Sequence, residues 1–172
     1  MEVLRLLPKN PKTSLQTGRR SHRCRVARDE STRAGLSSTR VGRAEAFRPC
    51  REVKHTTFWM MGAFGSALDA VSCALQVRRD IATYNDTREG EELLVRFGLN
   101  AGEPIVDDDD LFGLSVTLAA RIGDWGEPGQ VVVSDVVRQL LLGKTFDFTS
   151  LGEATLKGFD EPVPLYEVRT QG

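Results

Sequence analysis

The sequence lacks the features that mark several classes of protein. Its three cysteines form no C-x-x-C pair and no even framework, which argues against a disulfide scaffold or a zinc site. No stretch approaches the roughly 18 consecutive apolar residues that span a bilayer, and the apolar start is too quickly broken for a secretory signal. We therefore expect a soluble, cytoplasmic protein without membrane association.

Motifs for catalysis or phosphate binding are equally scarce. The two histidines, His22 and His55, have no Ser or Cys at a spacing typical of a nucleophilic triad. There is neither a G-x-x-x-x-G-K-[ST] loop nor a G-x-G-x-x-G motif, so a nucleotide would have to be held in another way. Four consecutive aspartates, residues 107–110, could offer oxygen ligands to Mg²⁺ or Ca²⁺. Adjacent carboxylates rarely converge on one ion, so a solvated turn is the better interpretation.

Charge divides the chain into two unequal parts. Residues 1–50 hold twelve Arg or Lys against four Asp or Glu, a net charge of +8, whereas the remainder holds eleven against twenty, a net charge of −9. The basic part shows no sustained helical or strand periodicity, which predicts a disordered arm. Its arginines could contact nucleic acid, and its composition loosely resembles an organelle transit peptide. Because it lacks interleaved aromatics, we favour a solvated tail and expect no nucleic-acid partner.

A folded domain is expected over residues 51–169, followed by a short tail of residues 170–172. Its apolar periodicity predicts strands within 53–64 (a pair), 93–106, 130–133, 146–151 and 163–168, and helices over 66–86, 114–125 and 135–142. Gly98 and Gly102 indicate a bulge or a close backbone approach. Ser134 is placed to cap the third helix by accepting an amide hydrogen bond. This alternation implies an α/β layer fold with the helices against one face of a sheet.

The order of short motifs along this domain resembles the catalytic domain of class III adenylate and guanylate cyclases. The motifs are EVK at 52–54, LNAGE at 99–103, LFG at 111–113, VTLAAR at 116–121, PGQV at 128–131 and LKGF at 156–159. The resemblance implies an α/β (α+β) ferredoxin-like sandwich that works as a dimer with active sites at the interface. It also implies conversion of a nucleoside triphosphate to a 3′,5′-cyclic monophosphate and pyrophosphate with Mg or Mn.

Carried over residue by residue, the resemblance assigns four site residues. Lys54 falls where the family has a lysine that contacts the purine. Asp110 falls at the acceptor for the adenine amino group, which favours ATP over GTP. Arg121 matches the arginine that meets charge developing on the phosphate, a task suited to a guanidinium fork. Thr117, one helical turn earlier, stands where active members have an asparagine that orients the ribose or the attacking hydroxyl.

The resemblance also implies two losses. Phe58 lies where the family has a Gly-Asp-Gly turn whose aspartate binds catalytic metal, and no counterpart of the first strand, which carries the second metal aspartate, is found in residues 1–50. We therefore expect a sheet that lacks its first strand and helices, a chain without metal ligands, and marginal or partner-dependent stability. A shifted reading frame in the gene would account for both the basic arm and residues 57–62.

These features predict a cyclase homology domain that is inactive by itself, because two-metal activation of the 3′-hydroxyl has no ligands. The alternative is a non-catalytic regulatory or dimerisation module in cyclic nucleotide signalling. In family dimers, one subunit supplies the metal carboxylates and the other the residues that contact purine, ribose and phosphate. Since this chain keeps candidates for the second set only, it could complete one site on an intact cyclase subunit, whereas a homodimer could complete none.

Overall fold

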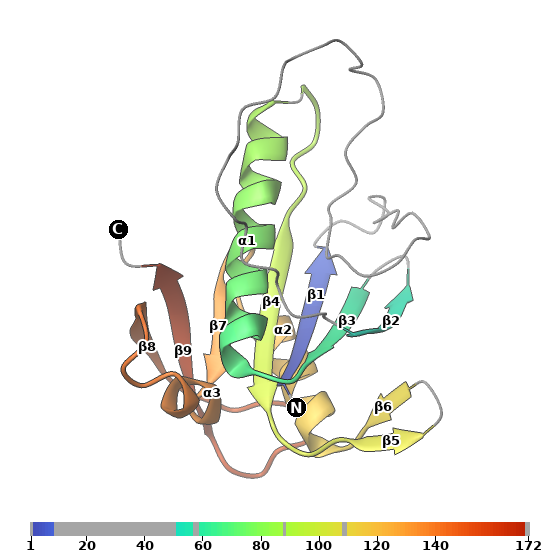
Figure 1. The fold of residues 1–172 in the computed structure, drawn as a ribbon, viewed down its shortest axis with the longest axis vertical. Coiled ribbons are helices and arrows are strands. Elements are labelled where there is room, and N and C mark those ends of the chain that lie inside the picture. Colours follow the sequence, from blue (N-terminus) through green and yellow to red (C-terminus); the bar gives the residue numbers. More distant parts are fainter. Residues whose placement is uncertain (1, 9–50, 57–58, 88, 108–109, 171–172) are drawn as a thin grey trace, which may run out of the picture.

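The computed structural model describes residues 2–8, 51–56, 59–87, 89–107 and 110–170. Seven strands form one sheet in the order β2-β3-β1-β4-β7-β9-β8 (Figure 1). They are β1 (Glu2–Pro8), β2 (Arg51–Thr56), β3 (Trp59–Phe64), β4 (Val95–Ala101), β7 (Val131–Ser134), β8 (Phe146–Ala154) and β9 (Val163–Thr170). The remaining elements are α1 (Ala67–Asp86), α2 (Leu114–Trp125), α3 (Asp135–Leu140) and a separate antiparallel ribbon of β5 (Ile105–Asp107) and β6 (Asp110–Phe112). In the described part of the chain, no helix is long and apolar enough to cross a bilayer.

Helices cover both faces of the sheet, which corrects the expectation of helices against one face only. Successive residues of a strand point to opposite faces, and β4 shows this directly. Phe97 and Leu99 belong to the large core cluster that includes the buried face of α1, whereas Gly98 lies against the backbone of α2. Figure 1 shows α1 and α2 on opposite sides of β4. Since β4 is covered on both sides, its sequence is apolar or small except at Arg96 and Asn100.

The place of the first strand is filled, which corrects the expectation that residues 1–50 contribute no strand. Residues Glu2–Pro8 form β1, which pairs antiparallel with both β3 and β4. The physical reason is that a gap between β3 and β4 would leave two rows of backbone groups unpaired in the middle of the sheet, and the short apolar run Val-Leu-Arg-Leu-Leu can supply the partner. The expectation that the helices after the first strand are missing falls on the rest of the basic arm, residues 9–50, which lies outside the described residues.

The N-cap serine forms a side-chain capping hydrogen bond at the start of α1 but not at the start of α3. Ser66 is the N-cap of α1, and its side-chain oxygen accepts a hydrogen bond from the Asp69 amide at 3.4 Å. Ser134 is also the N-cap residue of α3, but it makes no side-chain capping bond. Its hydroxyl instead donates to Asn100 Oδ1 at 2.7 Å, so the predicted N-cap position is confirmed and the predicted capping hydrogen bond is wrong. The Ser134 hydroxyl bonds to Asn100 Oδ1 on the neighbouring strand β4 because this buried acceptor would otherwise be left without a hydrogen bond.

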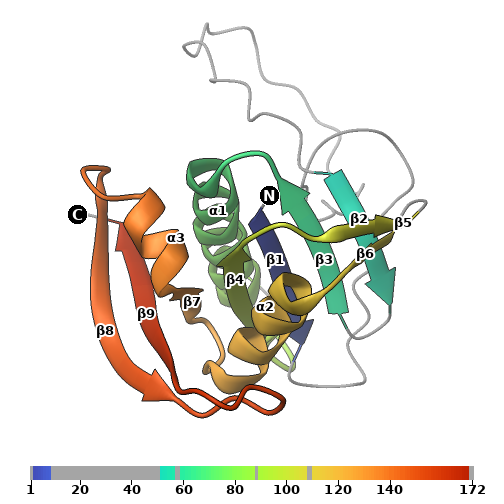
Figure 2. The ribbon, with the colours of Figure 1, turned by 90° about the horizontal axis from the view of Figure 1, so that it is seen from below.

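The β5–β6 ribbon, like β1, is an element that periodicity missed. The sequence predicts a turn at residues 107–110, and the structure has strands on both sides of it, with Ile105 opposite Phe112 in the register. Each strand has only three residues, too few to show a period of two. The ribbon extends beyond the main sheet and lies beside β2 (Figure 2).

Candidate functional site

A small buried cluster joins β6 and α2, which carry three of the predicted site residues, to β3, the strand that pairs with the Lys54 strand β2. It contains Met61 of β3, Leu111 of β6 and Ala119 of α2. Met61 is the register partner of Lys54 in β2, and Leu111 directly follows Asp110. The apolar contacts of this cluster therefore hold the purine-contacting candidates, which are about 55 residues apart in sequence, on the same flank of the sheet (Figure 2).

Helix α2 brings the other two candidates to that flank. Ala119 is fully buried and lies between Thr117, which is exposed, and Arg121, which is half-buried. Residues four apart lie on the same face of a helix, so Thr117 and Arg121 form one column on α2. The side of α2 that carries Ala119 faces the core and leaves this column at the surface.

The Thr117 hydroxyl is already used as a hydrogen-bond donor. It donates to the carbonyl oxygen of Gly113, one turn earlier, at 3.1 Å. Gly113 is the N-cap of α2 with a φ of 113°, a conformation that L-residues rarely adopt. Because a hydroxyl has one proton and two lone pairs, Thr117 in this arrangement offers an acceptor to a ligand, and not the donor that an asparagine amide would add.

The guanidinium of Arg121 is partly engaged within its own helix. One terminal nitrogen forms an ion pair with Asp124 Oδ2 at 3.4 Å, and the side chain is 35% exposed. Its Nε is buried and has no hydrogen-bond partner among the described residues. A surface ion pair of this kind contributes little stability, so an anionic ligand can compete for the guanidinium at small cost.

The two purine-contacting candidates lie on strands at the edge of the domain. Asp110 is half-buried, and its Oδ1 accepts a hydrogen bond from the Leu111 amide at 3.0 Å, which orients the carboxylate. The register of β2 shifts between Glu52 and Lys54, an irregularity of the type that redirects side chains at sheet edges. The Lys54 side chain itself lies outside the described residues.

The described residues do not fit a catalytic metal site of the kind that the resemblance implies. In the register of β1 and β3, Leu6 lies opposite Met60, near the β2–β3 connection, while Glu2 lies opposite Phe64 at the far end. The end of β1 beside that connection therefore consists of Leu6, Leu7 and Pro8 and offers no carboxylate. Phe58 lies outside the described residues. Among those that are described, no group of three or more His, Cys, Asp or Glu side chains is placed to hold a metal ion.

The polar contacts between β4 and α2 were not predicted from the sequence. Arg96 donates to the Asp124 carbonyl oxygen at 3.1 Å, and Asn100 donates to the Ser115 carbonyl oxygen at 3.1 Å. The available signal was a polar residue at alternate positions of an otherwise apolar strand, Arg96 and Asn100 with Gly98 between them. The predicted close backbone approach is confirmed at Gly98, where an added Cβ would lie 2.2 Å from the Gly123 nitrogen.

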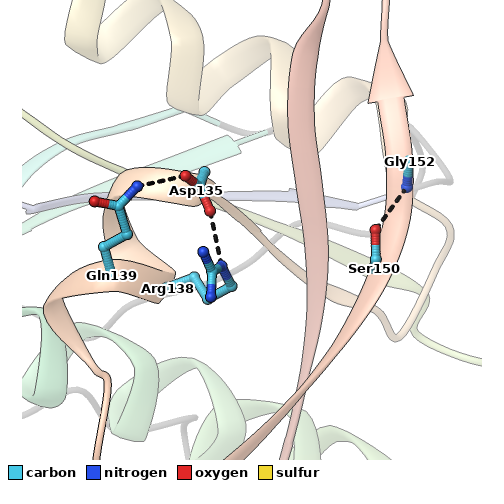
Figure 3. A network of polar contacts seen from close by, with 5 residues as sticks. All are labelled: Asp135, Arg138, Gln139, Ser150 and Gly152. Atoms are coloured by element: carbon cyan, nitrogen blue, oxygen red, sulfur yellow. Dashed lines mark hydrogen bonds and ion pairs between the residues drawn. The ribbon is translucent and has the colours of Figure 1, made fainter.

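A second polar network lies on α3, away from the β2–β6–α2 flank. The Asp135 carboxylate accepts hydrogen bonds from the side chains of Arg138 and Gln139 (Figure 3), and the Arg138 guanidinium lies 4.8 Å from the centroid of the Tyr166 ring. The Arg138 hydrogen bond, followed by that of Gln139, lowers the pKa of Asp135 below its ordinary value of 3.8. The side chains of Asp135, Arg138 and Gln139 are bonded to one another, so they form a structural network and not a ligand site.

Comparisons of this chain with protein families, curated relatives and solved structures all point to the same family. Residues 56–169 match the adenylate and guanylate cyclase catalytic domain. Over 118 residues the chain is 36% identical to a putative adenylate cyclase 3 of Rhizobium meliloti, covering 67% of this chain and 20% of that protein. The chain thus spans about a fifth of the length of this relative.

Solved structures agree with this match. An adenylate/guanylate cyclase/hydrolase from Silicibacter pomeroyi has a TM-score of 0.63 at 31% identity, covering 72% of this chain and 74% of that one. The catalytic core of a rhodopsin-guanylyl cyclase with converted specificity, in complex with ATPαS, has a TM-score of 0.62 at 26% identity, covering 70% of this chain and 71% of that one. The predicted fold class, an α+β sandwich of the nucleotide cyclase type, is confirmed.

Proposed function

Because the chain belongs to the adenylate and guanylate cyclase catalytic domain family, we propose that it binds ATP and completes the active site of an intact cyclase subunit. The observation that supports this most is the cluster of Met61, Leu111 and Ala119. It holds β6 and α2, which bear three of the candidate residues, against β3, the strand whose Met61 is the register partner of Lys54. The chain supplies residues for purine, ribose and phosphate, and the partner supplies the rest. We place this activity in the cytoplasm.

Each candidate has a task that its chemistry allows. Asp110 accepts a hydrogen bond from the adenine amino group, and Lys54 donates to a ring nitrogen. Thr117 accepts a hydrogen bond from a ribose hydroxyl, because its own proton is held by Gly113. As the 3′-hydroxyl attacks the α-phosphate and pyrophosphate leaves, charge builds on the phosphate oxygens, and Arg121 stabilises it after leaving Asp124. Metal ions in such a site would activate the 3′-hydroxyl, and their ligands would come from the partner.

The β5–β6 ribbon supports the need for a partner. Ile105 and Leu114 are 66% and 74% exposed, and Phe112 is 48% exposed. These apolar side chains gather on a short ribbon and the start of α2, directly beside the candidate residues. Contiguous exposed apolar side chains are typical of protein interfaces, so a second subunit placed here would also reach the nucleotide.

The test is complementation. The chain is mixed with a homologous cyclase that retains its metal aspartates but has its own phosphate-contacting arginine replaced, and cyclic AMP formed from ATP is measured. The mixture should recover activity, and Arg121→Ala should lower the recovered rate roughly 10²- to 10³-fold, the usual effect of losing a transition-state donor. Arg79→Ala is the matched control, because Arg79 is exposed on α1 and its side chain bonds only to Gln76 in the described contacts.

Two outcomes would contradict this proposal. The purified chain alone should form no cyclic AMP, so robust turnover without a partner would mean that metal ligands exist and were misplaced. A heterodimer that forms but recovers no activity would support the alternative, a non-catalytic regulatory or dimerisation module that uses the cyclase interface.

A further inference from the structure

We infer that Asn100 is a positioning residue that sets where α2, and with it Thr117 and Arg121, lies relative to the sheet. The positional part stands on the geometry alone, and its consequence for turnover rests on the proposed function. Asn100 is on β4, is 3% exposed and is one of three buried polar residues in the described core. A buried amide that does not face a ligand is costly unless it is fully bonded, so its bonds indicate what it does.

The two ends of the Asn100 amide are assigned by the chemistry of their partners. The nitrogen Nδ2 donates to the Ser115 carbonyl oxygen at 3.1 Å, and a carbonyl oxygen can only accept. The oxygen Oδ1 then accepts from the Ser134 hydroxyl at 2.7 Å. Ser134 is itself 2% exposed at the end of β7. The hydroxyl therefore holds the amide with its donor directed at α2, and the contact links two strands to the first turn of that helix.

Two further contacts from the same face of β4 hold α2 along its length. At Gly98, an added Cβ would lie 2.4 Å from the Ala119 carbonyl oxygen, so the backbones touch. Near the other end of the helix, Arg96 donates to the Asp124 carbonyl oxygen at 3.1 Å. The backbone contact fixes how closely α2 approaches the sheet, while the directional bonds from Asn100 and Arg96 fix its position along and around its axis.

The helix transmits this position to the candidate residues. Thr117 comes two residues after Ser115, and Arg121 comes six residues after it. On a rigid helix this places them roughly 3 Å and 9 Å beyond Ser115 along the axis. A slip by one residue would turn the column of Thr117 and Arg121 by about 100°. Apolar packing alone tolerates such slips better than a hydrogen bond does, because it has no direction. Asn100 is therefore suited to hold the phosphate-contacting arginine in register.

The first experiment measures amide hydrogen exchange in the free chain. Asn100→Ala should accelerate exchange in α2 about tenfold relative to α1, as expected for losing a buried hydrogen bond. Ser134→Ala, which removes only the bond that orients the amide, should give a smaller acceleration in α2 and carries the test if Asn100→Ala does not fold. The matched control is Asn85→Ala, because Asn85 also makes two bonds, to the Leu93 nitrogen and oxygen at 2.9 and 3.0 Å, away from α2.

The second experiment uses the complementation assay with kcat and KM separated. If Asn100 positions Arg121, Asn100→Ala should lower kcat per heterodimer roughly tenfold to a hundredfold, whereas Asn85→Ala should leave kcat unchanged. Exchange that rises equally in α1 and α2, or an unchanged kcat in Asn100→Ala, would overturn the inference and leave Asn100 a purely structural residue. If the wild-type chain itself fails to complement, the proposed function fails, and the exchange experiment still decides the position of α2.

Discussion

The two faces of β4 hold their helices by different means. On the α1 side, Val95, Phe97 and Leu99 are at most 2% exposed and belong to one large apolar cluster. On the α2 side, the alternate residues are a glycine that allows backbone contact and two polar side chains that bond to α2 carbonyl oxygens. The same strand therefore presents a hydrophobic face toward α1 and, toward α2, a face of Arg96, Gly98 and Asn100. We call the second the directional face, because its hydrogen bonds depend on distance and angle.

The difference fits what each helix carries. α1 is a helix of 20 residues with eight buried side chains, and its contribution is buried apolar area, which is not directional. α2 has four buried residues and carries both helical site candidates. A helix that must present particular side chains at a fixed place benefits from hydrogen bonds and close contact, since these constrain distance and angle.

The largest expected effect is on the apolar face. Phe97→Ala removes a large, fully buried ring from the α1 cluster, so unfolding free energy should fall by about 3–5 kcal/mol, measured by urea denaturation. Phe112→Ala is the matched control, because Phe112 is 48% exposed and its truncation should cost about 0.5 kcal/mol or less. Equal losses in the two variants would contradict the assignment of the main core to the α1 side.

A smaller and more local effect is expected on the directional face. Gly98→Ala places a Cβ 2.2 Å from the Gly123 nitrogen, so α2 must move away from β4, at a cost of about 1–3 kcal/mol. Hydrogen exchange should rise most in α2. Gly65→Ala, where an added Cβ meets nothing within 4 Å, should leave stability nearly unchanged. Tolerance of Gly98→Ala would show that the two backbones are not in contact.

The smallest effect concerns α3, whose polar contacts are at the surface and not buried as those of Asn100 are. Because the hydrogen bond from Arg138 lowers the pKa of Asp135 below 3.8, the ionised carboxylate is favoured in the folded state. Its contribution to stability is present above the unfolded pKa and is lost as pH falls through the lower folded value. Arg138→Gln should raise the Asp135 midpoint toward 3.8 in an NMR titration. An unchanged midpoint would contradict the ion pair.

Several elements were predictable because they depend on local sequence. The spacing of apolar residues after Ser66 predicts α1 almost to its last residue, and the strands at residues 130–133 and 163–168 are found within a few residues of the expected places. The four candidate site residues came from motif order, and the structure places their elements together. Their roles in nucleotide binding stay predictions.

Other features could not be predicted from local sequence. Nothing near Glu2–Pro8 indicates a central strand, because its partners Phe64 and Ala101 are some 60 and 100 residues away. The hydroxyl of Ser134 was expected to cap α3, but an acceptor on β4 competes for it. Both errors have the same cause, a long-range partner that the local pattern does not reveal.

The sequence by itself determined the periodic elements, the family and the candidate residues, because periodicity and motif order are properties of neighbouring residues along the chain. Only the tertiary structure decided that β4 is covered on both faces, that β1 completes the sheet, and that Asn100, Gly98 and Arg96 contact one helix. Those features depend on which backbone groups and side chains meet after the chain has closed long loops, and their partners are chosen by the need to satisfy buried hydrogen bonds and fill space across the whole domain.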